Sequence, residues 1–134
     1  MKIVFDGDVS APEILIGLTL TEMKFIGTQL ATLGDTLMIS GNGVADRFYP
    51  EILRGLIFEL TTIPDLQSLV AISLEDRMVC CRGGSEALGK LGNSLLNYFS
   101  EPVAEGDHLH IDYHEGSQLL APTKCHLIIM PIYE

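Results

Sequence analysis

Basic residues are scarce in this chain. Only 8 Lys and Arg residues stand against 18 Asp and Glu residues, which gives a formal net charge of −10. Binding to the phosphates of nucleic acid, or to an anionic membrane, depends on Lys and Arg. The composition therefore argues against nucleic acid and membranes as partners and favours a basic partner. Selection for solubility alone is the other explanation of such an acidic composition.

Long apolar runs and paired cysteine motifs are also missing. No uncharged apolar run approaches the roughly 20 residues that cross a bilayer, and the opening MKIVFDGD has no signal-peptide pattern, so we expect a cytoplasmic protein. The three cysteines, Cys80, Cys81 and Cys125, are an odd number without C-x-x-C spacing. This pattern predicts small buried side chains and neither disulfides nor reactive thiols.

Sequence motifs for catalysis are absent as well. The chain contains no G-x-S-x-G, no H-E-x-x-H and no glycine-rich phosphate loop. We therefore predict no catalytic residue and no cofactor, and we expect that the protein is not an enzyme.

The chain does contain clear periodic segments within the length of one domain, 134 residues. Helical spacing is found at 20–34, with Thr21 as a candidate N-cap, and at 85–99, with Ser85 as N-cap and an apolar stripe that ends at Phe99. Strands are expected at 1–6, 14–20, 35–40, 68–74, 77–83, 107–113 and 123–133. The run 51–63 fits either a strand or a helix by itself.

The order of these segments suggests that residues 1–64 and 65–134 are two pseudo-repeated ββαββ halves of a single domain. LTEMKFIGTQL and SEALGKLGNSL share an apolar-Gly-x-x-Leu core that contains Gly27 and Gly92, and 51–63 then corresponds to a strand. We expect an α+β fold in which one antiparallel sheet carries both helices on one face. The shared glycine would let each helix sit close to the sheet.

The stretch GDHLHIDYHEG, residues 106–116, is the strongest candidate for a functional surface. Because side chains alternate along a strand, its histidines and Asp112 would share one polar face while Leu109, Ile111 and Tyr113 share a dry face. The predicted partner-binding residues are Asp107, His108, His110, Asp112, His114 and Glu115. Phe48 and Tyr49, in a loop beside acidic residues, form a second predicted contact surface.

A metal site is the alternative interpretation of the histidines. Imidazoles two residues apart on one strand face can both reach a Zn²⁺ or Fe²⁺ ion, and His126 on the next strand could join His108 and His110. No second ligand cluster accompanies them in the sequence. Surface histidines are therefore the favoured interpretation, and no metal is predicted.

The C-terminal half resembles a known family. Gly84-Ser85-Glu86-Ala87-Leu88, the following helix, HLHID at 108–112 and HLIIMPI at 126–132 are similar to Imm32-type immunity proteins of bacterial polymorphic toxin systems. The resemblance covers residues 84–132, and the chain differs from the family in its additional N-terminal half and in Thr123-Lys124, where a serine is expected. It implies a small cytoplasmic protein that binds and neutralises a cognate toxin domain.

Three classes of function thus stay open at this point. The first is an immunity protein whose acidic surface binds a basic toxin domain. The second is a small metal-dependent enzyme that uses the His-x-His strand to activate water. The third is a structural domain that forms a homodimer or larger homo-oligomer through edge strands.

Overall fold

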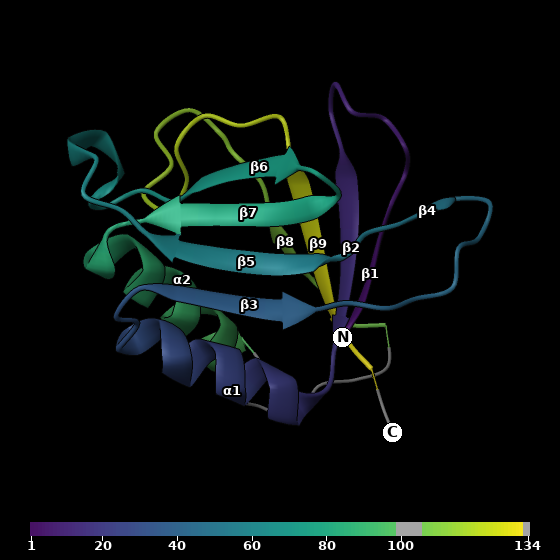
Figure 1. The fold of residues 1–134 in the computed structure, drawn as a ribbon, viewed down its shortest axis with the longest axis horizontal. Helices are drawn as coiled ribbons and strands as arrows, with labels where there is room; N and C mark the ends of the chain where they lie inside the picture. Colours follow the sequence, from purple (N-terminus) through teal and green to yellow (C-terminus); the bar gives the residue numbers. More distant parts are fainter. Residues whose placement is uncertain (99–105, 133–134) are drawn as a thin grey trace.

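The computed structural model describes residues 1–98 and 106–132. In chain order the elements are β1 (Lys2–Phe5), β2 (Glu13–Leu18), α1 (Leu20–Ala31), β3 (Thr36–Ser40), β4 (Glu51–Ile52), β5 (Gly55–Leu60), the 3₁₀ helix η1 (Pro64–Leu66), β6 (Ala71–Glu75), β7 (Met78–Gly83), α2 (Ser85–Tyr98), β8 (Leu109–Ile111) and β9 (His126–Pro131). The fold is α+β, as the sequence predicts (Figure 1). Phe99 and Tyr133, expected in a helix and a strand, lie outside the described residues.

The strands form two mixed sheets. Sheet A has the order β4-β1-β2-β9-β8 and sheet B the order β3-β5-β7-β6. Strands β2 and β9 are parallel, as are β5 and β7, while the other pairs of strands are antiparallel. The prediction of one antiparallel sheet is therefore wrong.

Each half of the chain contributes to both sheets, which explains this difference. The β1–β2 hairpin lies in sheet A, and the last strand of the first half, β5, lies in sheet B. The β6–β7 hairpin lies in sheet B, and the last strands of the second half, β8 and β9, lie in sheet A. In Figure 1 the strands of sheet B run across the direction of β1, β2 and β9. The internal duplication of the sequence itself stays a prediction.

The expected strand at 51–63 is divided between the sheets. Leu53, buried between β4 and β5, donates its N–H to Ile3 of sheet A at 3.1 Å, and Arg54 donates its N–H to the carbonyl of Arg77 at 2.7 Å. The chain thus crosses from sheet A to sheet B at these two residues. A continuous apolar run gives no sign of such a crossing, because both flanking strands are partly buried.

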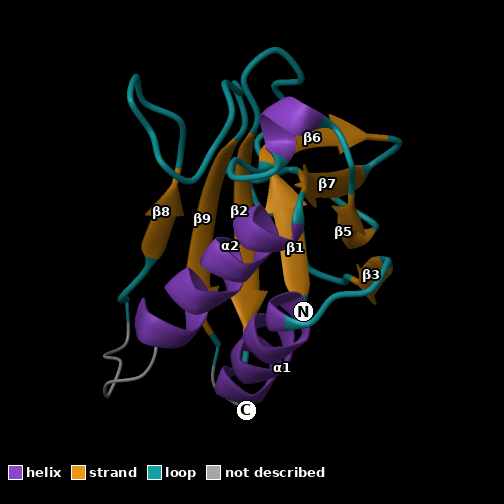
Figure 2. Cartoon of the chain, turned by 90° about the vertical axis from the view of Figure 1, so that its left-hand side faces the viewer, coloured by secondary structure: helices purple, strands orange, loops and turns teal. Residues whose placement is uncertain are grey.

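Both helices lie on the same side of sheet A and pack against each other (Figure 2). Their buried stripes enter one core together with the inner faces of both sheets. The helical core residues are Met23, Ile26 and Leu30 in α1 and Ala87, Leu88, Leu91 and Leu95 in α2. No polar or charged residue is buried within the described ranges, and none of the helices there is long and apolar enough to cross a membrane.

The helix starts and the shared glycines differ from expectation. Thr19, and not Thr21, caps α1: its side chain accepts the N–H of Glu22 at 3.1 Å, and the carboxylate of Glu22 accepts the N–H of Thr19 at 3.0 Å. Helix α2 begins at Ser85, so this residue lies inside the helix. Gly27 and Gly92 allow α1 and α2 to approach each other, and the predicted contact of each glycine with a sheet is wrong.

Candidate functional site

The histidines of β8 and β9 lie on the outer face of sheet A. Ile111 and Leu127 point into the core, so the alternation of side chains places His110 and His126 outward. His110 is paired with Ile128 across the antiparallel β8–β9 ladder, which leaves His126 as its diagonal neighbour.

Three imidazole rings meet on this face. The ring of His110 contacts that of His108 edge to face, with 4.7 Å between their centroids, and contacts that of His126 in the same manner at 5.2 Å. Nδ1 of His110 lies 2.9 Å from Nε2 of His126, and Nδ1 of His108 lies 2.9 Å from the carbonyl oxygen of Gly106. The structure thus brings together the three histidines that the sequence selected from two separate strands.

This geometry is that of a hydrogen-bonded histidine row. A distance of 2.9 Å between two ring nitrogens suits one donor and one acceptor, so one of the two rings donates its N–H to the other. Among the residues that the structure describes, no group of three or more His, Cys, Asp and Glu side chains is arranged to hold a metal ion.

The outer face of sheet A also carries Tyr49. Glu13 of β2 is the register partner of His126 in the parallel β2–β9 pair, and it points outward because Ile14 is buried. The hydroxyl of Tyr49 donates to Oε2 of Glu13 at 3.1 Å. The loop that contains Tyr49 therefore reaches the strand beside the histidines, and the two predicted contact surfaces lie on one sheet face. We call Glu13, Tyr49, His108, His110 and His126 the histidine face.

Negative charge surrounds the Tyr49 end of this face. Partial burial, the hydrogen bond to Glu13, and the charges of Glu13, Asp6 and Asp46 together raise the pKa of Tyr49. The carboxylate of Asp46 accepts the N–H groups of Tyr49 and Phe48, both at 2.8 Å, and these bonds lower the pKa of Asp46. This acidic environment keeps the hydroxyl of Tyr49 protonated as a donor.

Sequence reasoning missed Glu13, Asp6 and Asp46. Glu13 is 36 positions from Tyr49, and their contact depends on how a loop folds over a sheet, which no local pattern shows. The Asp46-x-Phe48-Tyr49 spacing does fit a side-chain-capped turn, and it is the one signal that could have drawn attention to this end.

The remaining predicted residues lie around the histidine face. Strand β8 ends at Ile111, so Asp112 and His114 follow it in a loop, whereas the sequence predicted that both belong to the strand. This loop continues into a turn at Glu115 and Gly116, where Gly116 has a φ of 82°. Asp107 precedes the strand, and the described side chains from Asp112 to Glu115 are all exposed.

A groove of about 320 Å³ runs along the free side of β8. His110, Asp112 and His114 line it together with Ser94 of α2 and Ser117. An adjoining hollow of about 370 Å³ shares Ser94, His114 and Ser117 and extends along α2 to Lys90. Asp112 and His114 therefore lie near His110 along this groove, although they are outside the strand.

Phe48 is the most peripheral of the predicted residues. Its side chain is 66% exposed, and the guanidinium of Arg47 lies 4.7 Å from the centre of its ring. Of the predicted aromatic pair, Tyr49 is thus half-buried against the sheet while Phe48 projects from it.

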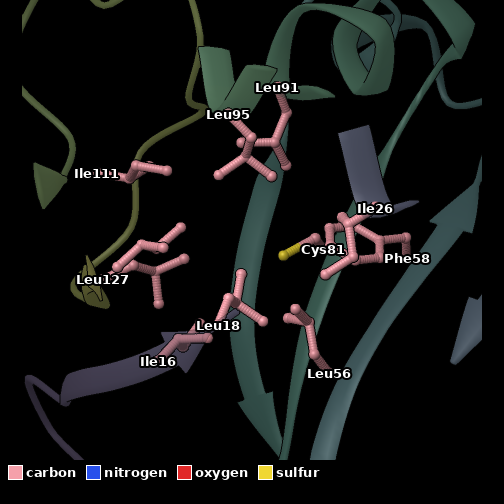
Figure 3. Close-up of a pocket in the computed structure, with 11 residues that line it drawn as sticks. Ile16, Leu18, Ile26, Leu56, Phe58, Cys81, Leu91, Leu95, Ile111 and Leu127 are labelled. Atoms are coloured by element: carbon pink, nitrogen blue, oxygen red, sulfur yellow. The ribbon is translucent and has the colours of Figure 1, made fainter. Parts of the chain in front are cut away.

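A small internal cavity in the described part of the chain is apolar and separate from the histidine face. It has a volume of about 20 Å³ between the two sheets and the helix pair, and Figure 3 shows the aliphatic side chains that point into it. Its one heteroatom side chain, Cys81, has a pKa raised by burial and by the neighbouring Cys80 and Cys125. The cavity has room for about one water molecule and offers no acid or base.

Comparison of the chain with models of protein families, with curated proteins and with solved structures finds no match in any of the three. The chemistry of the histidine face and of its acidic surroundings therefore carries the functional interpretation.

Proposed function

We propose that this protein is an immunity protein that binds a basic bacterial toxin domain through the histidine face and the groove beside it. The observation that carries the proposal is the Tyr49–Glu13 hydrogen bond, formed within the field of Asp6 and Asp46 and next to the row of histidines. It unites an aromatic anchor, carboxylates and imidazoles on one exposed sheet face. In this role the protein would act in the cytoplasm of the toxin-producing cell.

Electrostatics supports a basic partner. The chain carries a net charge of −10, and Asp107, Asp112 and Glu115 flank the β8 end of the face while Asp6 and Asp46 flank the other end. Carboxylates at both ends would attract a basic surface and orient it along the row. Complementary charge of this kind raises association rates and selects among partners more than it adds to affinity.

The chemistry of the face suits recognition. Tyrosine and histidine present rigid rings with polar edges, which contribute contact area at a low cost in conformational entropy. The groove along β8 adds a concave element at the edge of the face, where Asp112 and His114 can receive a projecting basic side chain. A toxin domain with a basic substrate cleft would be blocked by such a contact without any catalytic step.

The proposal is tested with the purified protein and the product of the adjacent upstream gene. We expect tight one-to-one binding by calorimetry and loss of the toxic activity of that product. The double variant Asp112→Lys with Glu115→Lys should bind with an association rate reduced by about tenfold or more, because two carboxylates that flank the histidine face become cations. Tyr49→Phe and Glu13→Gln separately test the opposite end.

A matched control changes the charge equally at other exposed carboxylates. Asp65 lies on η1 and Glu86 in the first turn of α2. The double variant Asp65→Lys with Glu86→Lys should keep the wild-type association rate. Equal loss in both double variants would mean that only net charge matters, and it would remove the assignment to the histidine face.

Metal analysis of protein purified without a histidine tag tests the alternative that the histidines bind a metal ion. We expect no stoichiometric zinc or iron. A bound equivalent of either metal, together with absence of toxin binding, would overturn the proposal and make His108, His110 and His126 a metal site.

A further inference from the structure

The two sheets have four edge strands, and two of them, β6 and β4, are covered within the described residues. Beside β6, Val70 bridges to Leu120, and the hydroxyl of Thr123 donates to the carbonyl of Ile72 at 2.8 Å. At β4, which is two residues long, the guanidinium of Arg77 donates to the carbonyl of Ile52. Such covers prevent an edge from pairing with another chain.

Strand β8 is protected in other ways. It is three residues long, and the carbonyl of His108 just before it accepts the hydroxyl of Tyr98 at 2.6 Å. Asp107 and Asp112 flank the strand on either side. A short edge bordered by charge is a poor template for pairing with a second copy of an acidic chain.

Strand β3 has no such cover, is longer than β8, and has a flanking carboxylate, Asp35, at one end only. It spans Thr36–Ser40, has the sequence TLMIS with no charged residue and no proline, and pairs only with β5 in the described part of the chain. It is the outermost strand of sheet B in Figures 1 and 2. The side chain of Met38 at its centre is 64% exposed.

The hydrogen bonds at the ends of β3 show which of its backbone N–H and C=O groups do not bond to β5. The carbonyl of Asp35 accepts the N–H of Leu60 at 2.9 Å, and the N–H of Gly41 donates to Arg54 at 2.8 Å. Because bonding alternates along an antiparallel ladder, the odd-numbered residues of β3 bond to β5. The N–H and C=O groups of Thr36, Met38 and Ser40 therefore point away from the sheet.

We propose that β3 pairs with β3 of a second copy of this chain, antiparallel, across a twofold axis at Met38. In this register Thr36 lies opposite the partner's Ser40, and Met38 lies opposite the partner's Met38. All the open groups are then matched, because each pair of outward residues exchanges two bonds. Sheet B continues through the axis as one sheet.

Charge favours β3 over the other edge strands as the place where a second copy of this chain binds. Two chains of net charge −10 repel each other, and β3 is an edge without a carboxylate. In the proposed register Asp35 faces the partner's Gly41, so no like charges are placed opposite each other. The side chains in contact are Met38 across the axis, on the outer face of the sheet, and Leu37 beside the partner's Ile39 on the inner face.

The contact is small, and the dimer is therefore weak. A pair of five-residue strands buries less than the roughly 1,000 Å² that a stable specific interface usually requires. By mass action the dimer forms only as concentration rises. The inference is independent of the proposed function, because β3 belongs to sheet B and the histidine face to sheet A.

Sedimentation velocity over about a hundredfold range of protein concentration tests the dimer. Wild-type protein should shift from monomer to dimer. Met38→Pro removes one outward N–H and leaves the bonds to β5 intact, and Met38→Lys brings two cations together at the axis. Both variants should stay monomeric with thermal unfolding close to wild type. Val44→Lys makes the same charge change at a loop residue that is 80% exposed, and it should dimerise as wild type does.

Cysteine cross-linking tests the register. Facing residues in a bonded antiparallel pair lie about 5.5 Å apart between Cα atoms, within reach of a disulfide. Met38→Cys should form a covalent dimer under mild oxidation, whereas Ser40→Cys, which faces the partner's Thr36, should not. The wild-type chain, with its three buried cysteines, is the control for any cross-linking that does not involve the introduced cysteine. A monomer at every concentration, dimerisation that survives Met38→Lys, or cross-linking only through Ser40→Cys would overturn the proposal.

Discussion

Gly27 of α1 and Gly92 of α2 lie against each other where the two helices pack. A Cβ atom on Gly27 would be 3.0 Å from the carbonyl oxygen of Gly92, and a Cβ atom on Gly92 would be 2.8 Å from the carbonyl oxygen of Gly27. The reciprocity means that neither helix can gain a methyl group here without separation of the backbones. These two glycines set the distance between the helices and hence the position of both helices over sheet A.

Gly92→Ala should destabilise the protein by about 1 to 3 kcal/mol, because the new methyl group meets a backbone oxygen that cannot move aside. Gly89 lies one turn earlier in α2, and a Cβ atom there would meet nothing within 4 Å. Gly89→Ala should therefore stabilise by about 0.5 to 1 kcal/mol through helix propensity. Urea unfolding of both variants measures the contrast, and similar effects of the two substitutions would contradict the assigned role of Gly92.

The same two glycines show how much of the fold could be predicted from the sequence. The match between LTEMKFIGTQL and SEALGKLGNSL correctly selected both helices and pointed to Gly27 and Gly92, because helical periodicity is a local property. It did not reveal that the glycines face each other. Contacts between elements depend on the division of the strands into two sheets, and the parallel pairs that create this division join strands distant in the sequence.

The candidate site was predicted to a similar extent. Alternation along the strand correctly grouped His108 with His110, and His126 joins them because β9 lies beside β8. The end of β8 at Ile111 was not visible in the sequence, so Asp112 and His114 were expected in the strand and lie in the loop after it. The contact of Tyr49 with Glu13 required the fold of a loop over the sheet.

The capping box of α1 should give the protein a pH-dependent stability. Burial acts to raise the pKa of Glu22, but the hydrogen bond from the Thr19 N–H and the nearby N-terminal ammonium outweigh it, and the net shift is downward. A lowered carboxyl pKa stabilises the fold above the ordinary pKa, and this contribution is lost as the pH falls through the lowered value. Glu22→Gln should therefore cost about 0.5 to 1 kcal/mol at neutral pH and less at about pH 3.

Urea unfolding at the two pH values measures this difference. Thr19→Ala, which removes the other half of the box, should cost about 1 kcal/mol at both pH values, while Thr19→Ser keeps the oxygen and should stay near wild type. A cost of Glu22→Gln that does not change with pH would show that the carboxylate charge plays no part in the cap.

The cysteines of β7 should react slowly in the folded protein. Burial, together with the negative charge of Glu75, raises the pKa of Cys80 to about 11, and burial also raises that of Cys81. A raised pKa leaves the thiol protonated at pH 8, and the protonated thiol is a poor nucleophile. Iodoacetamide followed by mass spectrometry should show little labelling until urea is added. Glu75→Gln should speed labelling of Cys80 and Glu86→Gln should not.

Partner binding through the histidine face should depend on the contact between His110 and His126. Nδ1 of His110 lies 2.9 Å from Nε2 of His126, and Glu13 is the register partner of His126 on the neighbouring strand. The double variant His110→Gln with His126→Gln removes both rings and should bind the partner about tenfold more weakly, because the rigid contact surface of the rings is lost. Calorimetric titration of the wild-type protein and the double variant measures the two affinities, and an unchanged affinity would exclude the histidines from the contact.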